Sequence, residues 1–339
     1  MSDWRIWVKR KFSGIQGQAV RNFQEANAAC TRKNYAVALP LYEESLQQFR
    51  QLQQWDMVLP LRLHLGDVNR LAGDYAAART HLEQAISLAR TQKHNDYLDA
   101  ALIRLATVAG LQGEYGLAAR LCAECLQLEP LPEKELEYAA TQFLLGSISK
   151  TMAEGRAHFE RALEIYRERE HREGILDCLC SLGHCTEPGQ DSSPQRVWLQ
   201  ECLELCEPHE DERLSSYVLN NLGNIERFEG QLDRALELYR DSLRIKQRLD
   251  DEWAIAYTLE GCAALAAARR EGAIAARLLG NASAIRKRLG RPLERQKQPE
   301  YDAVLAEVRE LLPAAEFEVA WEGGRTLPVS LIVAEVMEE

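Results

Sequence analysis

The chain has 339 residues, with 41 lysines and arginines against 52 aspartates and glutamates, and a formal net charge of −11. Because binding to nucleic-acid phosphates needs positive charge, this balance argues against a nucleic-acid partner. No apolar run approaches the length that spans a bilayer and no signal-peptide pattern occurs, so we expect no stable membrane insertion.

The first segment, residues 1–17, is basic and rich in aromatic side chains. Trp4, Trp7 and Phe12 share one face if the segment is helical, which would suit a membrane-surface anchor. The alternative is a capping helix that covers the open end of the structure that follows. The segment is short and is closed by Gly14 and Gly17, so we favour the cap.

A periodic pattern begins near residue 18. Six small residues recur at intervals of 40, 40, 40, 37 and 40 residues: Ala26, Gly66, Ala106, Gly146, Gly183 and Gly223. After each one come a polar turn, an aromatic residue or Leu, and a second small residue. Apolar residues are spaced by three, four and seven throughout, which indicates helices and no sheet. A period of this length is typical of stacked repeats.

Each unit reads as two antiparallel helices joined by a turn. Gly73, Gly113 and Gly230 stand where a first helix should end, in the left-handed conformation that glycine adopts most easily. Tyr75 and Tyr115 should each begin a second helix. The small residues then mark the points where two helix backbones approach closely, so Gly146 and its counterparts should be buried.

These features resemble the tetratricopeptide repeat in a longer form, over residues 18–285. The resemblance implies an all-α, right-handed superhelical solenoid of about seven helix-turn-helix repeats, with at least fourteen helices. It also implies that the first helices line an inner groove.

Four departures from the pattern predict local irregularity. The fourth unit is three residues short, so its turn at residues 150–154 should be tight. The fifth unit has a loop rich in Pro, Gly and Ser at residues 187–194, which should shorten its helices. Pro40 should kink or delay the second helix of the first unit. The seventh unit is rich in Ala and degenerate, as repeats at the end of a solenoid often are.

Residues 286–339 should form a helical C-terminal cap. The stretch 276–282, with 288–293 and 317–327, looks like the end of repeat arrays in bacterial STAND-class signal-transduction ATPases, including LuxR-type and AfsR-type regulators. In that family the array is a sensor or docking arm. The phosphate-binding Gly-x-x-x-x-Gly-Lys-Ser/Thr motif does not occur, nor is a DNA-binding helix-turn-helix evident. The chain is then either a stand-alone relative or the arm of a larger regulator.

The nine cysteines are an odd number and lie mostly in predicted helices, which fits a reducing cytoplasm. Cys122 and Cys125 occupy packing positions. A denser group could hold a metal or sense redox changes with His184: Cys178, Cys180, Cys185, Cys202 and Cys206. Its spacing favours packing, so we expect no metal and no cofactor.

The inner groove is the predicted working surface. Register with the small residues places these side chains along it: Asn27, Asp67, Arg70, Lys150, His184, Tyr217, Asn220, Asn224 and Arg227. An asparagine amide can donate and accept, so it can bind the backbone of an extended peptide. The alternative is that these asparagines only bridge helices.

Two functional interpretations follow. The first is a non-catalytic scaffold or adaptor that binds a protein or peptide in the groove, in bacterial signalling or assembly. The second is a regulatory sensor arm gated by a small ligand, a metal or a redox change at the Cys-rich fifth repeat. The seven histidines are scattered over different units, and none forms a recognisable nucleophile–base arrangement, so we do not expect an enzyme.

Overall fold

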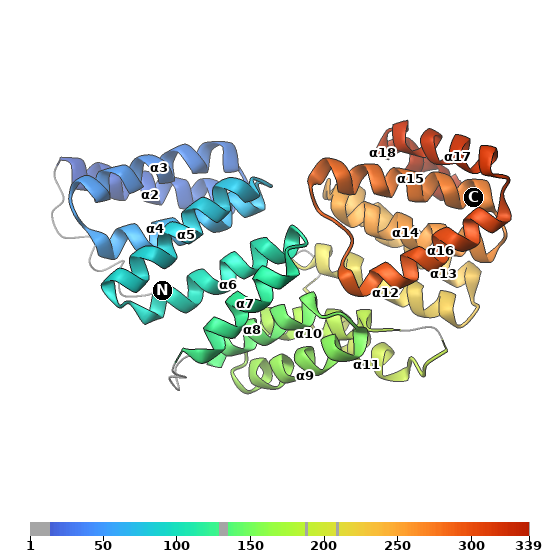
Figure 1. The fold of residues 1–339 in the computed structure, drawn as a ribbon, viewed down its shortest axis with the longest axis horizontal. Coiled ribbons are helices and arrows are strands. Elements are labelled where there is room, and N and C mark those ends of the chain that lie inside the picture. Colours follow the sequence, from blue (N-terminus) through green and yellow to red (C-terminus); the bar gives the residue numbers. More distant parts are fainter. Residues whose placement is uncertain (1–13, 129–134, 187–188, 208–209, 339) are drawn as a thin grey trace. The chain divides into compact units, whose positions relative to one another are not determined.

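A computed structural model describes residues 14–128, 135–186, 189–207 and 210–338. Within these ranges the chain forms 17 α-helices and one 3-10 helix, with no strand (Figure 1). The first fourteen helices form seven successive antiparallel pairs. The predicted all-α repeat fold is therefore confirmed. None of these helices is long and apolar enough to cross a membrane.

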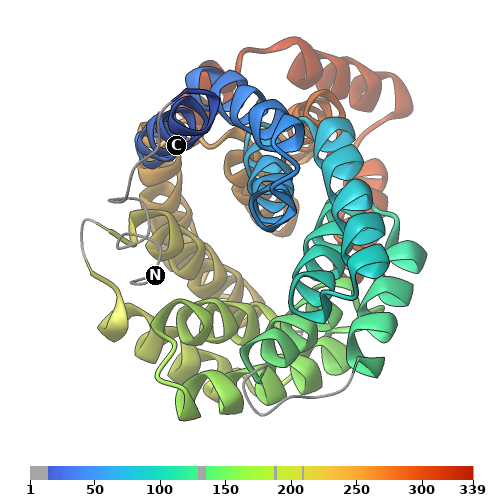
Figure 2. The ribbon, with the colours of Figure 1, turned by 90° about the vertical axis from the view of Figure 1, so that its left-hand side faces the viewer.

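The chain divides into two compact units, residues 1–132 and 133–339. Unit 1 contains α2 (Ile15–Thr31), α3 (Tyr35–Gln51), α4 (Trp55–Leu71), α5 (Tyr75–Gln92), α6 (Asn95–Leu111) and α7 (Tyr115–Gln127). Unit 2 continues the pairing with α8 (Glu135–Ile148), α9 (Met152–Glu168), α10 (Arg172–His184), α11 (Ser193–Leu205), α12 (Glu212–Phe228), α13 (Leu232–Arg248), α14 (Glu252–Ala268) and α15 (Gly272–Leu289). It ends with η2 (Arg295–Lys297), α16 (Gln298–Leu311), α17 (Ala314–Thr326) and α18 (Val329–Glu338). Figure 2 shows the paired helices within each unit.

Close contact at the small residues explains the pairing. A Cβ atom added to Gly66 would lie 2.6 Å from Leu82, so the first helix approaches the second without a side chain between them. Gly146 faces Phe159 in the same way, again at 2.6 Å. The partner follows 16 residues later in the second unit but 13 residues later in the fourth, because the fourth unit is three residues short. The predicted burial of Gly146 is confirmed.

The turns also follow the sequence. Gly73, Gly113 and Gly230 have φ angles of 84°, 78° and 78°, the left-handed region that favours glycine. The helices α5 and α7 begin at Tyr75 and Tyr115, as predicted.

The structure differs from the sequence-based expectation at Pro40 and Gly17 and agrees with it around the loop of the fifth unit. The helix α3 begins five residues before Pro40 and runs through it, so the predicted delay of that helix is wrong. Residues 1–13 of the predicted N-terminal cap lie outside the described residues, while Gly17 lies inside α2 and does not end a helix. The helices α10 and α11 have 13 residues each against 17 in α4, which confirms the predicted shortening around the loop of the fifth unit.

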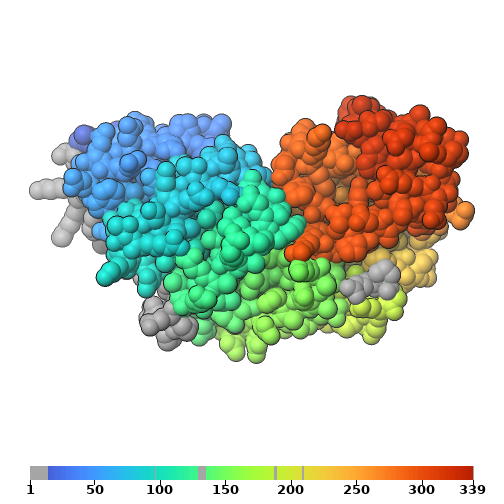
Figure 3. Space-filling model, viewed as in Figure 1, coloured from blue at the N-terminus to red at the C-terminus, as the bar shows by residue number. Residues whose placement is uncertain are grey.

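A helical cap closes the end of unit 2, as predicted. The backbones of α17 and α15 approach so closely that a Cβ atom on Gly324 would lie 1.9 Å from the carbonyl oxygen of Arg277. Gly280 stands in the same relation to the carbonyl oxygen of Trp321, at 2.3 Å. Phe317 of α17 joins the core cluster of unit 2. The space-filling view shows α15 to α18 (orange to red) as one packed body (Figure 3).

Candidate functional site

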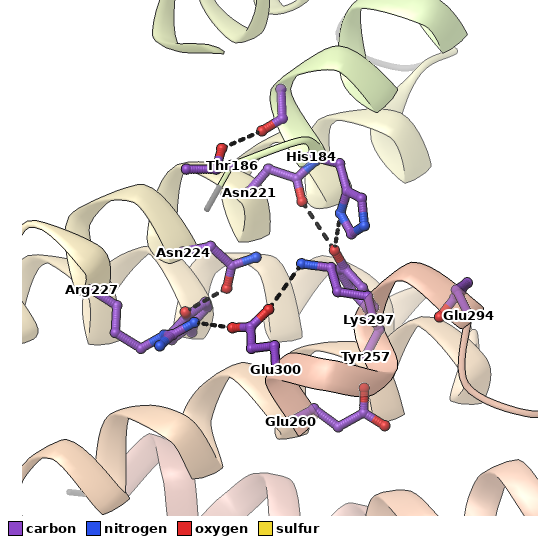
Figure 4. A network of polar contacts seen from close by, with 12 residues as sticks. His184, Thr186, Asn221, Asn224, Arg227, Tyr257, Glu260, Glu294, Lys297 and Glu300 are labelled. Atoms are coloured by element: carbon purple, nitrogen blue, oxygen red, sulfur yellow. Dashed lines mark hydrogen bonds and ion pairs between the residues drawn. The ribbon is translucent and has the colours of Figure 1, made fainter. Parts of the chain in front are cut away.

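The first helices of three successive pairs in unit 2, α10, α12 and α14, lie side by side. Polar side chains gather on the face that they share, which we call the inner face of unit 2: His184, Asn221, Asn224, Arg227, Tyr257 and Glu260 (Figure 4). The one-repeat spacing of these helices brings together side chains that lie up to 76 residues apart in the sequence.

A chain of hydrogen bonds orders the centre of this face. The Tyr257 hydroxyl contacts His184 Nδ1 and donates to Asn221 Oδ1 at 3.3 Å, and Asn221 Nδ2 donates to the carbonyl oxygen of Cys180 at 3.2 Å. Burial, reinforced by the charge of Lys297, lowers the pKa of His184 to about 3, so the imidazole is neutral.

Asn224 forms a bridge between helices. Its Oδ1 atom accepts a hydrogen bond of 2.8 Å from the hydroxyl of Tyr239 on α13. In unit 1 the equivalent pair has the same geometry, because Asn27 Oδ1 accepts from Tyr42 at 2.6 Å across the same separation of 15 residues. This geometry supports the bridging alternative for both asparagines, and contact between these residues and a ligand stays a prediction.

Of two further predicted residues, Asn220 is buried and Tyr217 is partly buried. Asn220 is only 1% exposed, and neither atom of its amide has a hydrogen-bond partner among the described residues. Tyr217 packs its ring 6.1 Å from Trp253 and 6.2 Å from Tyr257. The Nζ atom of Lys246 lies 4.8 Å from the Tyr217 ring. Asn220 therefore offers no free side chain to a partner in this conformation, whereas Tyr217 stays partly exposed.

A segment of the chain itself lies on the inner face of unit 2. Residues 291–300, which we call the resident segment, comprise most of the connection from α15 to α16 and the first three residues of α16. At one end the guanidinium of Arg291 lies 3.9 Å from the ring centre of Trp253 on α14. At the other end Glu300 forms an ion pair with Arg227 on α12 and a second one of 3.3 Å with Lys297 (Figure 4).

The resident segment is deeply seated. Gln296 and Lys297 are only 9% and 7% exposed. The Oε1 atom of Gln296 lies 3.0 Å from where a Cβ atom on Gly155 of α9 would be, so the segment packs tightly against this glycine. Burial alone would raise the pKa of Glu300, but the charges of Lys297 and Arg227 lower it to about 2. The carboxylate is therefore ionised when the segment is in place.

A cavity of about 40 Å³ remains between the resident segment and the helices behind it. It is lined by Asn224, Tyr257 and Glu260 on the inner face and by Leu293, Lys297 and Glu300 on the segment, among others. A cavity of this size and polarity can hold a few water molecules. The segment thus does not fill the inner face completely.

The equivalent face of unit 1 has a different character. The rings of Phe23, Tyr42 and His64 cluster with centroids 5.6 to 6.0 Å apart. Beside them Asp67 Oδ2 accepts a hydrogen bond of 2.8 Å from Arg104 on the neighbouring first helix. The two side chains of this ion pair are 31% and 36% exposed. Arg70, at the C-terminal end of α4, is partly exposed as well.

Lys150 does not lie on the inner groove, where the register taken from the sequence placed it. It lies exposed in the turn after α8 and not on a helix face. The helix ends at Ile148 because the fourth unit is short, and Thr151 begins the next helix by accepting a hydrogen bond from the backbone of Glu154. The Glu154 side chain accepts in turn from the Lys150 backbone N–H at 3.2 Å, a pairing that fixes Lys150 in the turn.

The cysteines are packing residues in this structure. All nine are free thiols, and Cys122, Cys125, Cys178, Cys180, Cys185 and Cys202 are buried. Burial raises the pKa of Cys122 and of Cys180 to about 12. Thiols held protonated in this way react slowly, so nothing here favours the alternative of redox sensing. The described residues contain no group of three metal-ligating side chains.

Sequence reasoning missed several residues of the inner face of unit 2. Tyr257 and Glu260 lie in the seventh unit, where the degenerate pattern hid the register. Lys297 and Glu300 lie outside every repeat. The only signal for them was a run of charged and amide side chains between two apolar segments, and such a run usually indicates a solvated loop.

Comparisons with known proteins agree with the predicted array of tetratricopeptide-like repeats. Two family models, both described as tetratricopeptide repeat, match residues 20–91 and 217–249. Among solved structures the chain is similar to the apo form of the quorum sensor NprR from B. thuringiensis. The two are 14% identical, with a TM-score of 0.53, over 96% of this chain and 100% of that one. No curated protein sequence matches. Neither family model reaches residues 253–328, so their resemblance to STAND-class regulators stays a prediction.

Proposed function

We propose that this chain, which contains a tetratricopeptide repeat array, is a non-catalytic adaptor that binds an extended protein or peptide segment on the inner faces of its first helices. One observation carries the proposal. The inner face of unit 2 holds a polar segment, irregular over residues 291–294 and helical over 295–300, through ion pairs and a cation–π contact, which is how a peptide ligand would be held. That this ligand belongs to the same chain does not change the chemistry of the face.

A signalling role is part of the proposal. The array has the fold of a quorum sensor, which is a signalling protein, although an identity of 14% transfers the fold alone. An adaptor of this kind needs no cofactor. The partner is then a protein or peptide whose binding reports a state of the cell.

The partner is expected to bind at unit 1. There the ion pair between Asp67 and Arg104 is partly exposed, and the ring of His64 lies beside it. An aromatic surface next to opposite charges can hold a peptide side chain by stacking and orient its backbone by hydrogen bonds. Arg70 adds a cation at the end of the same helix.

The experiment uses peptides selected from a random phage-displayed library on the immobilised full-length protein. Each enriched peptide is titrated by calorimetry against wild type and Asp67→Ala. We expect a loss of affinity of about tenfold or more, because a charge-assisted contact at a desolvated interface contributes about 1.5–3 kcal/mol.

The matched control is Glu43→Ala. Glu43 also contacts a side chain of the neighbouring repeat, His81 at 3.0 Å, but on the second helices. Its loss should leave the affinity within about twofold of wild type, because this pair lies away from the proposed ligand and Glu43 is exposed. Equal affinities for wild type and Asp67→Ala across all selected peptides would refute binding at unit 1.

A further inference from the structure

We propose that the resident segment, residues 291–300, is a displaceable internal ligand. It occupies the inner face of unit 2 in place of an external peptide that carries a cationic residue followed three positions later by a carboxylate. This inference rests on the proposed function and adds to it the chemistry of a second ligand and the means of its control.

The contacts of the segment define the ligand chemistry. Glu300 supplies a carboxylate to Arg227, whose side chain is 11% exposed and has no other ion-pair partner among the described residues. Lys297, three positions earlier, pairs with Glu300 and lines the same cavity as Glu260. An external peptide must therefore bring a carboxylate for Arg227, because a buried guanidinium left without a counter-charge is costly.

The character of the contact shows why the segment can leave. The permanent cap, α17 on α15, is held by backbone contact at Gly324 and by the buried ring of Phe317. The resident segment is held mainly by charged and polar groups, which water can replace. Two buried polar atoms at or beside this contact have no hydrogen-bond partner among the described residues: Gln296 Oε1 and Arg227 Nε. Such atoms weaken the docked state relative to a solvated one.

The segment can leave without unfolding its neighbours. Residues 291–294 are not helical, and η2 contributes only three residues before α16 begins. Further along α16, Val308 is fully buried in the core cluster of unit 2, and α15 anchors the other end. Release therefore requires only that residues 291–300 move outward as a loop and that the first turn of α16 opens.

Attachment in the same chain explains why the docked state prevails. A ligand tethered by a short linker has an effective concentration in the millimolar range, so it competes well even when each contact is modest. The apparent affinity for an external peptide falls by the fraction of molecules in which the face is free. Weakening the contact between the resident segment and the inner face of unit 2 should therefore strengthen the binding of an external peptide, although no residue of the inner face itself has changed.

The test uses the full-length chain and a fluorescein-labelled synthetic peptide of residues 291–304 as the probe. The variant Glu300→Gln removes the charge that Arg227 holds but keeps the shape of the side chain. We expect this variant to bind the probe at least about tenfold more tightly than wild type in fluorescence anisotropy, because its own segment no longer competes. Trypsin cleavage after Lys297, a site buried in the docked state, should accelerate by about tenfold.

Glu310→Gln is the matched control, since Glu310 is an exposed carboxylate further along the same helix. It should behave as wild type in both assays. The same probe with glutamine at position 300 should fail to bind Glu300→Gln, which tests the Arg227 contact without altering the protein. Melting curves recorded in parallel establish that the variants fold.

Two results would overturn the proposal. If cleavage after Lys297 is unchanged in Glu300→Gln, the segment is a permanent part of the fold. If cleavage accelerates but the probe binds no more tightly than to wild type, the exposed face does not bind this chemistry. Either result leaves peptide binding at unit 1 untouched, because that binding is read from Asp67 and from different peptides.

Discussion

The inner faces of the two units share the same hydrogen bonds between helices and differ in what lies on them. In both units an asparagine of a first helix accepts a hydrogen bond from a tyrosine 15 residues later: Asn27 from Tyr42, and Asn224 from Tyr239. In both, a serine donates to the backbone carbonyl oxygen of the residue 26 positions earlier: Ser45 to Ala19, and Ser242 to Ser216. The first helices of unit 1 carry a partly exposed ion pair, whereas those of unit 2 carry the resident segment. The repeats thus set the scaffold, and a segment outside the repeats decides whether a face is free.

One buried position separates the units more sharply. The register that aligns Tyr42 with Tyr239 also aligns Phe49 with Lys246, and both residues are fully buried. Phe49 joins the apolar core of unit 1. Lys246 instead donates to Thr258 at 2.6 Å, with its ammonium over the rings of Tyr217 and Tyr257. Unit 2 therefore places a polar group directly behind its inner face.

The largest expected effect concerns the cap that only unit 2 has. Gly324→Ala places a methyl group 1.9 Å from a backbone oxygen of α15, a contact that no side-chain movement can relieve. We expect a loss of about 3 kcal/mol in the free energy of unfolding, at the upper end of overpacking costs. Urea unfolding measures it, and hydrogen exchange locates the loss in α15 and α17.

Gly323→Ala is the control, because Gly323 is the preceding residue of the same helix and has open space around it. Alanine should stabilise that position by about 0.5–1 kcal/mol through helix propensity. Equal stabilities of the two variants would mean that α17 does not dock on α15 as described, and the distinction between permanent cap and resident segment would fail.

The second prediction tests the buried lysine. Burial lowers the pKa of Lys246 to about 7, although Asp251, Cys180 and Cys262 oppose this shift and Arg213 adds to it. In the unfolded chain the pKa returns to its ordinary value near 10.5. Between these two values the unfolded state holds one more proton than the native state, so the stability of wild type should rise with pH across this range.

Replacing Lys246 by Met removes this dependence. We expect Lys246→Met to be more stable than wild type by about 1–3 kcal/mol at pH 6, since a buried charge is replaced by an apolar side chain. The gain should shrink by pH 9, where the native lysine is neutral. Urea midpoints at both pH values give the comparison, with the exposed Lys287→Met as control. A gain that is the same at both pH values would show that Lys246 does not titrate between them.

The part of this structure that follows local rules could be predicted from the sequence. Helix starts, left-handed glycines such as Gly73 and the contact of Gly146 depend on periodicity and on the space that a side chain needs. The site was predicted less well. Arg227 was placed on the inner face, but its partner Glu300 lies 73 residues away in a segment without a repeat position, and the path of such a segment depends on packing across the whole unit. Lys150 failed for a local reason, because a register taken from full-length repeats overran a short one.

The smallest expected effect separates the two asparagine bridges. Asn224→Ala removes the acceptor of Tyr239 and leaves a buried hydroxyl without its partner, which costs about 1–2 kcal/mol in the free energy of unfolding. Asn27→Ala removes the acceptor of Tyr42 in the same way, but Asn27 is only partly buried, so water can take the place of the lost amide. We expect that loss to be about 0.5 kcal/mol.

Urea unfolding of both variants, with Tyr239→Phe and Tyr42→Phe to complete two double-mutant cycles, isolates each bond from the other effects of truncation. Coupling energies of equal size in the two units would mean that burial by the resident segment adds nothing to the bridge behind it. A larger coupling in unit 2, falling to the value of unit 1 when Glu300→Gln releases the segment, would show that the occupant of the face also sets the strength of the hydrogen bonds beneath it.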